Sequence, residues 1–399
     1  MKLLTFSTLY PNSERPQHGI FVETRLRHLL ASRSAQSRVV APVPWFPLRH
    51  PRFGYYAACA RVPTEEERHG ISILHPKYPL IPKFGMSSAP AMLAAAAINT
   101  LKKMLRNGYD FDIIDAHYFY PDGVAAALLG KILGKPVTIT ARGTDINLIP
   151  RYRLPRQMIR WAAHHAAGII AVCQALKDAI VALGIPENKV TVLRNGVDLE
   201  LFHPLPRDVE RQRLGLTKPS LLCVGHLIER KGYDIAIRAI TKLPEYELMI
   251  VGEGEEEQRL KALSLSLGVA DRVRFLGAIP QPELKRFYSA ADALVLCSSR
   301  EGWANVLLEA MACGTPVVAT GVWGTPEIIA SPEAGVLMQE RSPRSLVTSV
   351  HALFANCPDR SATRHYAEQF GWESTTRGQL ELFSEILEST PTHSKCLSM

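Results

Sequence analysis

Short apolar runs alternate with helix-like segments along most of the chain. The runs have the length and composition of buried strands. In the amino half they are Leu3–Phe6, Ser37–Ala41, Ile71–Leu74, Ile113–Ala116, Val137–Thr140, Gly168–Val172 and Val190–Leu193. The helices expected between them are Ile20–Ala31, Ala89–Arg106, Gly123–Leu133, Leu154–Ala166 and Leu176–Leu183. This alternation predicts an α/β protein with a parallel sheet.

The rhythm breaks near Asn195-Gly196-Val197-Asp198, where a polar, proline-flanked stretch follows (203–206). A second series of strand-like runs then comprises Leu221–Val224, Leu248–Val251, Val273–Leu276, Ala293–Cys297 and Val317–Ala319. We therefore expect two Rossmann-like domains facing a central cleft, residues 1–199 and 200–371. The polar tail, residues 391–399, is expected to be disordered.

Composition supports this division. The 399 residues suit two domains, and 47% hydrophobic with 21% charged residues is typical of a soluble globular protein. No apolar run approaches the roughly 20 residues that span a bilayer, and the first residues read as a strand, not as a signal peptide. The seven cysteines contain no C-x-x-C pair or metal spacing, which predicts a reducing, cytoplasmic compartment and no bound metal.

Positive charge is concentrated in the amino half. Residues 1–200 carry 25 lysines and arginines against 14 acidic residues, a net charge of +11, whereas residues 201–399 carry a net charge of −3. The first domain should therefore meet an anionic partner, such as a membrane surface, a lipid diphosphate or an acidic polysaccharide. Charge alone would also allow nucleic acid, or simply an unevenly charged surface.

The most informative segment is residues 301–318, between two strand-like runs. Glu301 lies on a loop, and Glu309 follows eight residues later on a short apolar helix that a Gly-Thr-Pro sequence ends. This unit places two carboxylates and a helix N-terminus at the carboxyl edge of a parallel sheet, where open α/β sheets bind ligands. The free N–H groups near Asn305 and Val306 would suit a phosphate.

A second candidate loop opens the second domain. Gly225 and His226 follow the strand Leu221–Val224, and Arg230 and Lys231 lie just before the next helix. Cations there could neutralise a diphosphate, although a surface turn with two solvated cations is the alternative. The spacing does not match a Walker motif.

Gly252 and Gly254 follow the next strand. They fit either an ordinary turn or a ligand passing close to the backbone.

In the first domain, three places offer polar groups or open backbone near the same sheet edge. Gly19 ends a long loop and opens a helix, which permits close approach of a substrate to backbone N–H groups. His117 ends a strand, where it could face the cleft or be a satisfied structural histidine. Arg142 and Asp145 follow the next strand. The pair Asp110 and Asp112 has a D-x-D form that we interpret as turn chemistry.

Two basic segments could recruit an anionic surface. Residues 89–106 end in Lys102, Lys103 and Arg106, and four arginines between residues 151 and 160 lie beside Tyr152 and Trp161. Basic residues next to aromatic ones suit a membrane interface, and solvated helix faces are the alternative.

Taken with these motifs, the chain resembles retaining glycosyltransferases of family 4, which have the GT-B fold. The resemblance covers nearly the whole chain and is clearest from Val190 to Ile329. Its signature is E-x7-E, matched by Glu301 and Glu309. The Glu301–Val306 run and the segment Arg142-Gly143-Thr144-Asp145 are most similar to bacterial cell-surface polysaccharide members, such as teichuronic-acid or exopolysaccharide transferases.

The resemblance implies roles for the candidate residues. Glu309 would hold the ribose of a nucleotide-sugar donor, Glu301 would touch the sugar, and Arg230 with Lys231 would stabilise the diphosphate. The donor would also meet Gly302, Trp303, Ala304, Asn305, Val306, Gly225, His226, Gly252 and Gly254. On the acceptor side the resemblance places Gly19, Arg142 and Asp145. His117 would line the same side as a catalytic candidate, together with Glu301, Arg230 and Lys231.

The family also implies a metal-independent reaction without a cofactor and a C-terminal helix, about 372–390, that crosses back to the first domain. There are departures from its pattern. Many members have arginine where this chain has His226, which shifts the cationic role to Arg230 and Lys231. The common Phe-Gly pair after the first glutamate is Trp303-Ala304, and a frequent serine is Cys173.

The resemblance implies a hexosyltransferase-type enzyme of cell-surface polysaccharide biosynthesis, which would move a sugar from a nucleotide-diphosphate donor to a glycan or polyprenyl-linked acceptor. Its expected location is the cytoplasm, with peripheral attachment to the inner membrane face, and nucleic acid is not an expected partner. Three alternatives are a sugar-nucleotide epimerase of the same fold, a nicotinamide dehydrogenase and a non-catalytic nucleotide-sugar-binding protein. The missing G-x-G-x-x-G after the first strand argues against the dehydrogenase.

Overall fold

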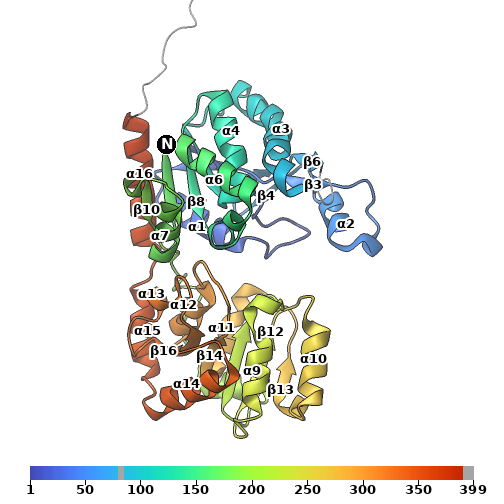
Figure 1. The fold of residues 1–399 in the computed structure, drawn as a ribbon, viewed down its shortest axis with the longest axis vertical. Helices are drawn as coiled ribbons and strands as arrows, with labels where there is room; N and C mark the ends of the chain where they lie inside the picture. The colour runs from blue at the N-terminus through green and yellow to red at the C-terminus, as the bar shows by residue number, and fades with distance from the viewer. Residues whose placement is uncertain (80–84, 390–399) are drawn as a thin grey trace, which may run out of the picture. The chain divides into compact units, whose positions relative to one another are not determined.

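The computed structural model describes residues 1–79 and 85–389. The chain divides into two compact units, after Arg194 and again after Trp372, a few residues from the expected boundaries. The first domain comprises Met1–Arg194 together with the C-terminal helix α16 (Glu373–Ser389), and the second comprises Asn195–Trp372 (Figure 1). The expected tail, residues 391–399, lies outside the described residues.

The first domain is built on an eight-stranded sheet of order β10-β9-β8-β7-β1-β2-β5-β4, parallel except where β4 pairs with β5. Its strands are β1 (Lys2–Phe6), β2 (Gln36–Val40), β4 (Glu65–Arg68), β5 (Ile71–Leu74), β7 (Ile113–His117), β8 (Val137–Ala141), β9 (Gly168–Ala171) and β10 (Val190–Val192). A separate parallel pair is formed by β3 (Val43–Trp45) and β6 (Lys77–Pro79).

The helices of the first domain are α1 (Ile20–Ala31), α2 (Gly54–Arg61), α3 (Gly85–Arg106), α4 (Val124–Leu133), α5 (Thr144–Asn147), α6 (Arg153–His165), α7 (Gln174–Ala182) and α16. The helices α3, α4 and α6 contact one another, and α1 contacts α16. Side chains of α1 and α16 share one core with alternate positions of the strands, including Leu3, Val39 and Ile113. Because strand side chains alternate, Asp115 and His117 point to the same face as Ile113.

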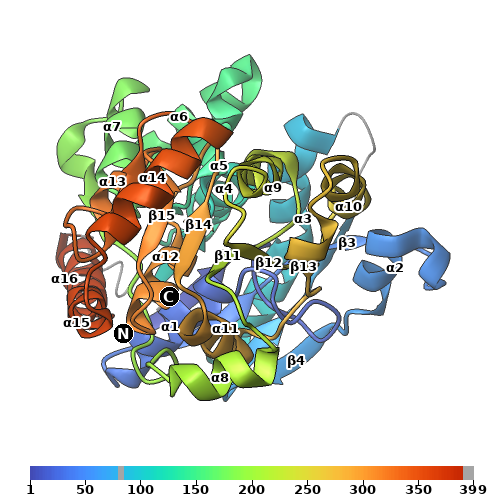
Figure 2. The same cartoon turned by 90° about the horizontal axis from the view of Figure 1, so that it is seen from below.

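The second domain has a six-stranded, wholly parallel sheet of order β13-β12-β11-β14-β15-β16. Its strands are β11 (Ser220–Val224), β12 (Glu247–Val251), β13 (Val273–Phe275), β14 (Ala293–Leu296), β15 (Val317–Thr320) and β16 (Gly335–Met338). Its helices are α8 (Arg207–Leu214), α9 (Tyr233–Ile240), α10 (Glu257–Ser266), α11 (Leu284–Ala290), α12 (Asn305–Ala312), α13 (Thr325–Ile328), α14 (Pro343–Ala355) and α15 (Arg360–Glu368), all seen from a second direction in Figure 2.

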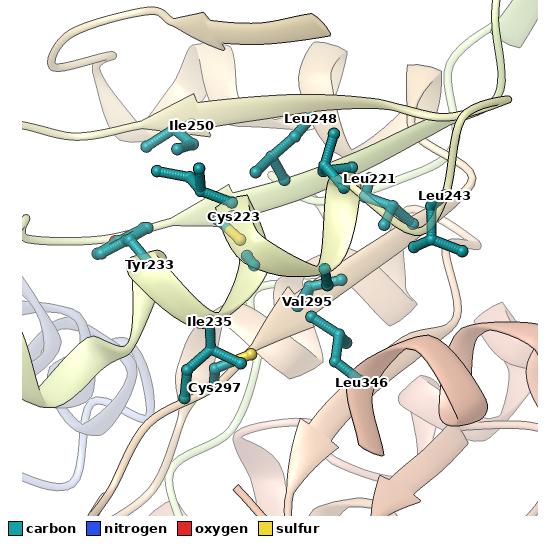
Figure 3. Close-up of a cluster of buried hydrophobic side chains, with 14 of the residues drawn as sticks. Leu221, Cys223, Tyr233, Ile235, Leu243, Leu248, Ile250, Val295, Cys297 and Leu346 are labelled. Carbon is teal, nitrogen blue, oxygen red and sulfur yellow. The ribbon is translucent and has the colours of Figure 1, made fainter. Parts of the chain in front are cut away.

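Apolar side chains from alternate strand positions form the core of the second domain. Leu221 and Cys223 of β11, Leu248 and Ile250 of β12, and Val295 of β14 gather beneath α9 and α14 (Figure 3). Near-continuous apolar strands of this kind are typical of parallel sheets that are covered on both faces. The core fixes the carboxyl edge of β11, β12 and β14, from which the candidate loops emerge.

Four strands were not predicted from the sequence: β3, β4, β6 and β16. The segment Glu65–Arg68 is fully polar and Gly335–Met338 begins with glycine, so neither has the apolar signature of an interior strand. No helix of residues 1–79 and 85–389 is long and apolar enough to cross a membrane.

We predict that α16 is an integral part of the first domain. Phe383 is fully buried in the core that α16 shares with α1, so Phe383→Ala should lower the free energy of unfolding by about 3–5 kcal/mol. Glu381 is exposed on the same helix, and Glu381→Ala should change it by less than about 0.5 kcal/mol. Urea titration of both variants checks this, and equal stabilities would contradict it.

Candidate active site

The loops after β11 and β14 are joined at the carboxyl edge of the second sheet. These two strands are neighbours, so their loops emerge side by side. The backbone N–H of Ser299 donates to the carbonyl of Arg230 (2.8 Å), and the Arg230 guanidinium donates to the carbonyl of Arg300 (3.1 Å). Gly232 has φ 70°, and a Cβ there would lie 2.3 Å from the Cys297 carbonyl oxygen. Only glycine permits this close approach.

This junction brings both predicted cations to Glu301. The Lys231 Nζ lies 2.7 Å from Glu301 Oε1, and the Arg230 NH1 lies 3.5 Å from the same oxygen. Glu301 is only 8% exposed. Burial alone would raise the pKa of Glu301, but Lys231 and Arg230 outweigh burial and hold this pKa below its ordinary value. Glu301 is therefore a carboxylate at neutral pH, beside two cations.

Glu301 leads directly into α12, which begins at Asn305. The residue before it, Ala304, has no side chain that could cap the helix. The backbone N–H groups of Asn305 and Leu307 donate to the carbonyls of Trp303 (3.1 Å) and Ala304 (3.0 Å). The Asn305 side chain accepts a hydrogen bond from Asn195 (3.3 Å). Trp303 and Ala304 are buried, and the Trp303 ring lies 6.2 Å from the Phe370 ring. This packing holds the start of α12 in place.

Glu309 has partners of its own. The Tyr288 hydroxyl donates to Glu309 Oε2 (2.8 Å), and the Gln281 amide donates to Glu309 Oε1 (3.1 Å). Burial raises the pKa of Glu309, although both hydrogen bonds act to lower it. Two uncharged donors thus orient this carboxylate, in contrast to the cations beside Glu301.

The glycines after β11 and β12 allow two loops to run in contact. A Cβ on Gly252 would lie 1.9 Å from the Gly225 carbonyl oxygen, and one on Gly254 would lie 2.3 Å from that of Leu227. Backbone hydrogen bonds join the loops, from Gly225 to Val251 and from Leu227 to Glu253. The glycines therefore have a packing role in the chain itself. His226 is exposed on this pair of loops.

In the first domain, Asp115 and His117 lie in a buried polar network. The Gln379 amide of α16 donates to Asp115 Oδ2 (3.1 Å), and His117 Nε2 lies 3.2 Å from the same oxygen. Arg142 NH2 lies 2.6 Å from His117 Nδ1, and Arg25 Nε donates to the side-chain oxygen Oε1 of Gln379 (3.0 Å). Because a guanidinium can only donate, Nδ1 must accept and the ring proton must lie on Nε2, toward Asp115.

Asp145 organises the loop after β8. Its carboxylate accepts backbone N–H groups from Phe119 (2.7 Å), Arg142 (3.1 Å) and Gly143 (2.6 Å). Burial raises the pKa of Asp145, although these hydrogen bonds act to lower it. Gly19 is equally structural, because the close approach that its φ of 70° permits is to Leu9 and Tyr10 of its own loop.

Comparison with known proteins places this fold and site in a family. Residues 206–370 match the model of glycosyl transferases group 1, and residues 25–201 match that of glycosyltransferase family 4. The D-inositol 3-phosphate glycosyltransferase of Thermobispora bispora is 32% identical over 311 residues, which cover 70% of this chain and 71% of that protein. This chain belongs to glycosyltransferase family 4.

A further relative and two solved structures support the assignment to family 4 and the fold. The putative teichuronic acid biosynthesis glycosyltransferase TuaC of Bacillus subtilis is 28% identical over 359 residues, 88% of each chain. Among solved structures, a sucrose-phosphate synthase of Thermosynechococcus elongatus aligns with a TM-score of 0.78 at 20% identity, over 97% of this chain and 99% of that one. HepE of Anabaena, solved with UDP-glucose, aligns with a TM-score of 0.72 at 21% identity, over 96% of this chain and 99% of that one. These likenesses confirm the GT-B fold.

The structure of the glycosyltransferase brings Glu301, Arg230 and Lys231 together, and His117 and Arg142 together. It also shows three side chains that the sequence analysis missed: Tyr288, Gln281 and Gln379. Gln379, Phe383 and Ile386 are buried on one stripe of α16, at helical spacings of four and seven. A glutamine on an apolar stripe is a signal that the sequence contains. Tyr288 and Gln281 carry no such signal, because their contact with Glu309 is visible only in the folded chain.

The buried His117 predicts a pH dependence of stability. Burial lowers the pKa of His117, with Arg142 adding to this and Asp115 opposing it. Below about pH 6.5, His117 binds a proton in the unfolded chain but not in the folded chain. The free energy of unfolding therefore falls by up to about 1.4 kcal/mol per pH unit. Urea titrations between pH 7 and pH 5 measure the free energy of unfolding. This free energy should fall less steeply with decreasing pH in His117→Gln than in the unchanged chain.

The exposed His165 provides the control for this experiment. His165→Gln should leave the decline as steep as in the unchanged chain. If His117→Gln and His165→Gln give the same profile, the neutral, buried state of His117 is wrong.

Proposed function

We propose that this glycosyltransferase moves a sugar from a nucleotide-diphosphate donor to a hydroxyl group of a glycan or lipid-linked glycan, with retention of anomeric configuration. The observation that carries the proposal is the cluster of Lys231 and Arg230 around the ionised Glu301, next to the uncapped start of α12. Two cations beside the N-terminus of a helix suit a diphosphate. The UDP-glucose complex of HepE, on the same fold, supports a nucleotide-sugar donor.

Each group in the cluster has a separate task in the proposed reaction. The bond between the sugar and the diphosphate breaks, so negative charge grows on the leaving group while positive charge grows on the sugar ring. Arg230, Lys231 and the backbone of Gly302–Val306 stabilise the leaving diphosphate, and Glu301 stabilises the sugar. Charges already held in position contribute strongly to such a step, because they need no reorganisation during the reaction.

Glu309 would bind the ribose hydroxyls of the donor. A carboxylate accepts two hydroxyl hydrogen bonds well when its own orientation is fixed, and Tyr288 and Gln281 fix it here. The glycine loops at Gly225 and Gly252 and the exposed His226 would meet the rest of the donor. No metal is needed in this scheme, because the cations of the chain neutralise the diphosphate.

The acceptor would be bound by the first domain, near His117, Arg142 and the loop that Asp145 organises. The relatives act, by name, on D-inositol 3-phosphate and in teichuronic acid biosynthesis. The net charge of +11 in residues 1–200 favours an anionic acceptor, and a polyprenyl-diphosphate-linked glycan at the membrane face meets this requirement.

The direct test is a panel of nucleotide sugars incubated with a lipid extract as acceptor. We expect release of a nucleoside diphosphate only when acceptor is present, and an NMR spectrum in which the new linkage keeps the anomeric configuration of the donor. An inverted product would contradict retention. Conversion of the donor alone to an epimer would favour an epimerase instead.

The orientation of Glu309 predicts a specific kinetic defect. Tyr288→Phe removes one hydrogen bond to a buried carboxylate, so the donor KM should rise about tenfold, since such a bond contributes about 1.5 kcal/mol, while kcat changes little. Tyr366 is a matched control, because its buried hydroxyl donates to the Ile328 carbonyl (2.9 Å). Tyr366→Phe should leave the donor KM unchanged, and equal KM values in both variants would refute this role of Tyr288.

A further inference from the structure

Residues 45–56, here called the aromatic arm, expose an unusual set of side chains. The arm runs from the end of β3 through a short 3-10 turn (Pro51–Phe53) into α2. Four of the nine large hydrophobic side chains exposed on the described part of the chain lie in it: Trp45 (57%), Leu48 (46%), Tyr55 (47%) and Tyr56 (38%). Such a concentration in one short segment marks an interaction surface rather than scattered surface residues.

The arm is held as an ordered platform. The Phe46 ring lies 5.5 Å from Phe53 and 5.4 Å from Tyr56, and the Tyr55 and Tyr56 rings are 5.4 Å apart. Its aromatic side chains thus pack on one another at the surface. Figures 1 and 2 both show α2 at the outer edge of the first domain.

The base of the arm is anchored to the domain. Ala57 and Cys59 of α2 are buried, and the Lys77 ammonium donates to the carbonyls of Cys59 (2.9 Å) and Val62 (2.7 Å) near the end of the helix. These bonds satisfy carbonyl groups that the last turn leaves without helical partners. An arm fixed at its base loses little conformational freedom when its outer side is covered, which favours binding.

The charged side chains of the arm itself are all cationic. Arg49 and Arg52 are exposed on the arm, and the Arg52 guanidinium lies over the Phe53 ring at 4.7 Å. Arg15 stacks on Tyr55 at 5.0 Å. No acidic residue occurs in the sequence between Arg38 and Glu65. Glu14 lies at the base of the arm, where it pairs with Arg61, whose guanidinium also donates to the Arg49 carbonyl (3.1 Å). The surface therefore combines apolar rings with an excess of positive charge.

We infer that the aromatic arm binds an anionic lipid membrane surface. Tryptophan and tyrosine rings favour the boundary between lipid headgroups and acyl chains, and nearby arginines gain from anionic headgroups. Protein interfaces are also rich in aromatic side chains and arginine, and the oligomeric-state readout below distinguishes a second copy of the chain from a membrane. The inference rests on the proposed membrane-linked acceptor for its biological purpose, and it differs from the sequence expectation, which placed membrane contacts at residues 89–106 and 151–161.

The test is co-sedimentation of the full chain with vesicles at low and high salt. The unchanged protein should bind vesicles of phosphatidylglycerol and phosphatidylethanolamine, bind phosphatidylcholine vesicles far less, and lose binding as salt rises. The triple variant Trp45→Ser, Leu48→Ser, Tyr55→Ser should partition at least about tenfold less strongly into the anionic vesicles, because rings at the interface and buried apolar area drive such binding. All three positions are exposed, so the fold should be retained.

Two control variants make the result specific. Ile132→Ser with Leu265→Ser removes two still more exposed apolar side chains elsewhere and should bind as the unchanged protein does. Tyr152→Ser with Leu154→Ser alters the basic segment at the start of α6 and should have a smaller effect than the arm variant. If the α6 variant loses binding and the arm variant keeps it, or if the unchanged chain ignores anionic vesicles, the inference is overturned.

Two further readouts separate this inference from its alternatives and from the proposed reaction. A dimer in solution that becomes monomeric in the arm variant would assign the surface to a second copy of the chain and overturn the membrane assignment. Nucleoside diphosphate binding, measured on the same samples, should be unchanged in the arm variant. Vesicle binding without nucleotide binding would refute the proposed reaction and leave the arm's role standing.

Discussion

The contact on which the second domain's chemistry depends is the ion pair between Lys231 and Glu301. It joins loops from two neighbouring strands and is supported by backbone bonds that leave little freedom to either loop. A buried ion pair adds little net stability, but removing one partner is costly because a charge is left buried without compensation. The pair is better understood as a contact that holds two cations, Lys231 and Arg230, beside one carboxylate, which the proposed donor requires.

The two glutamates of the E-x7-E signature are set apart by their surroundings. Cations lower the pKa of Glu301, whereas burial raises that of Glu309, whose donors are a hydroxyl and an amide. Two carboxylates on one short segment can therefore serve different parts of a donor. In the first domain, α16 takes part in the polar core through Gln379, so the last helix of the chain helps to hold Asp115 and, through it, His117.

Much of this architecture was readable from residue order. Apolar periodicity predicted the central strands and the helix Ile20–Ala31 with its observed limits. The motifs also predicted the two segments that bring Arg230, Lys231 and Glu301 together. Contacts between distant segments were not readable: Gln281 and Tyr288 around Glu309, and Gln379 on Asp115, depend on tertiary packing. The exposed rings of the aromatic arm were also missed, since a sequence rich in Trp, Phe and Tyr looks like a core segment until its burial is known.

The central claim is that Arg230 and Lys231 bind the diphosphate of the donor. Calorimetric titration of UDP, GDP and ADP into the full chain tests it most directly, with Arg230→Gln as the probe, because this variant leaves the Lys231–Glu301 pair in place. The exposed Arg238 of α9 provides the control. The account predicts saturable binding of at least one nucleotide, weakened about tenfold by Arg230→Gln, the effect of losing one charge-assisted bond, and unchanged by Arg238→Gln. Equal affinity in all three proteins would contradict it.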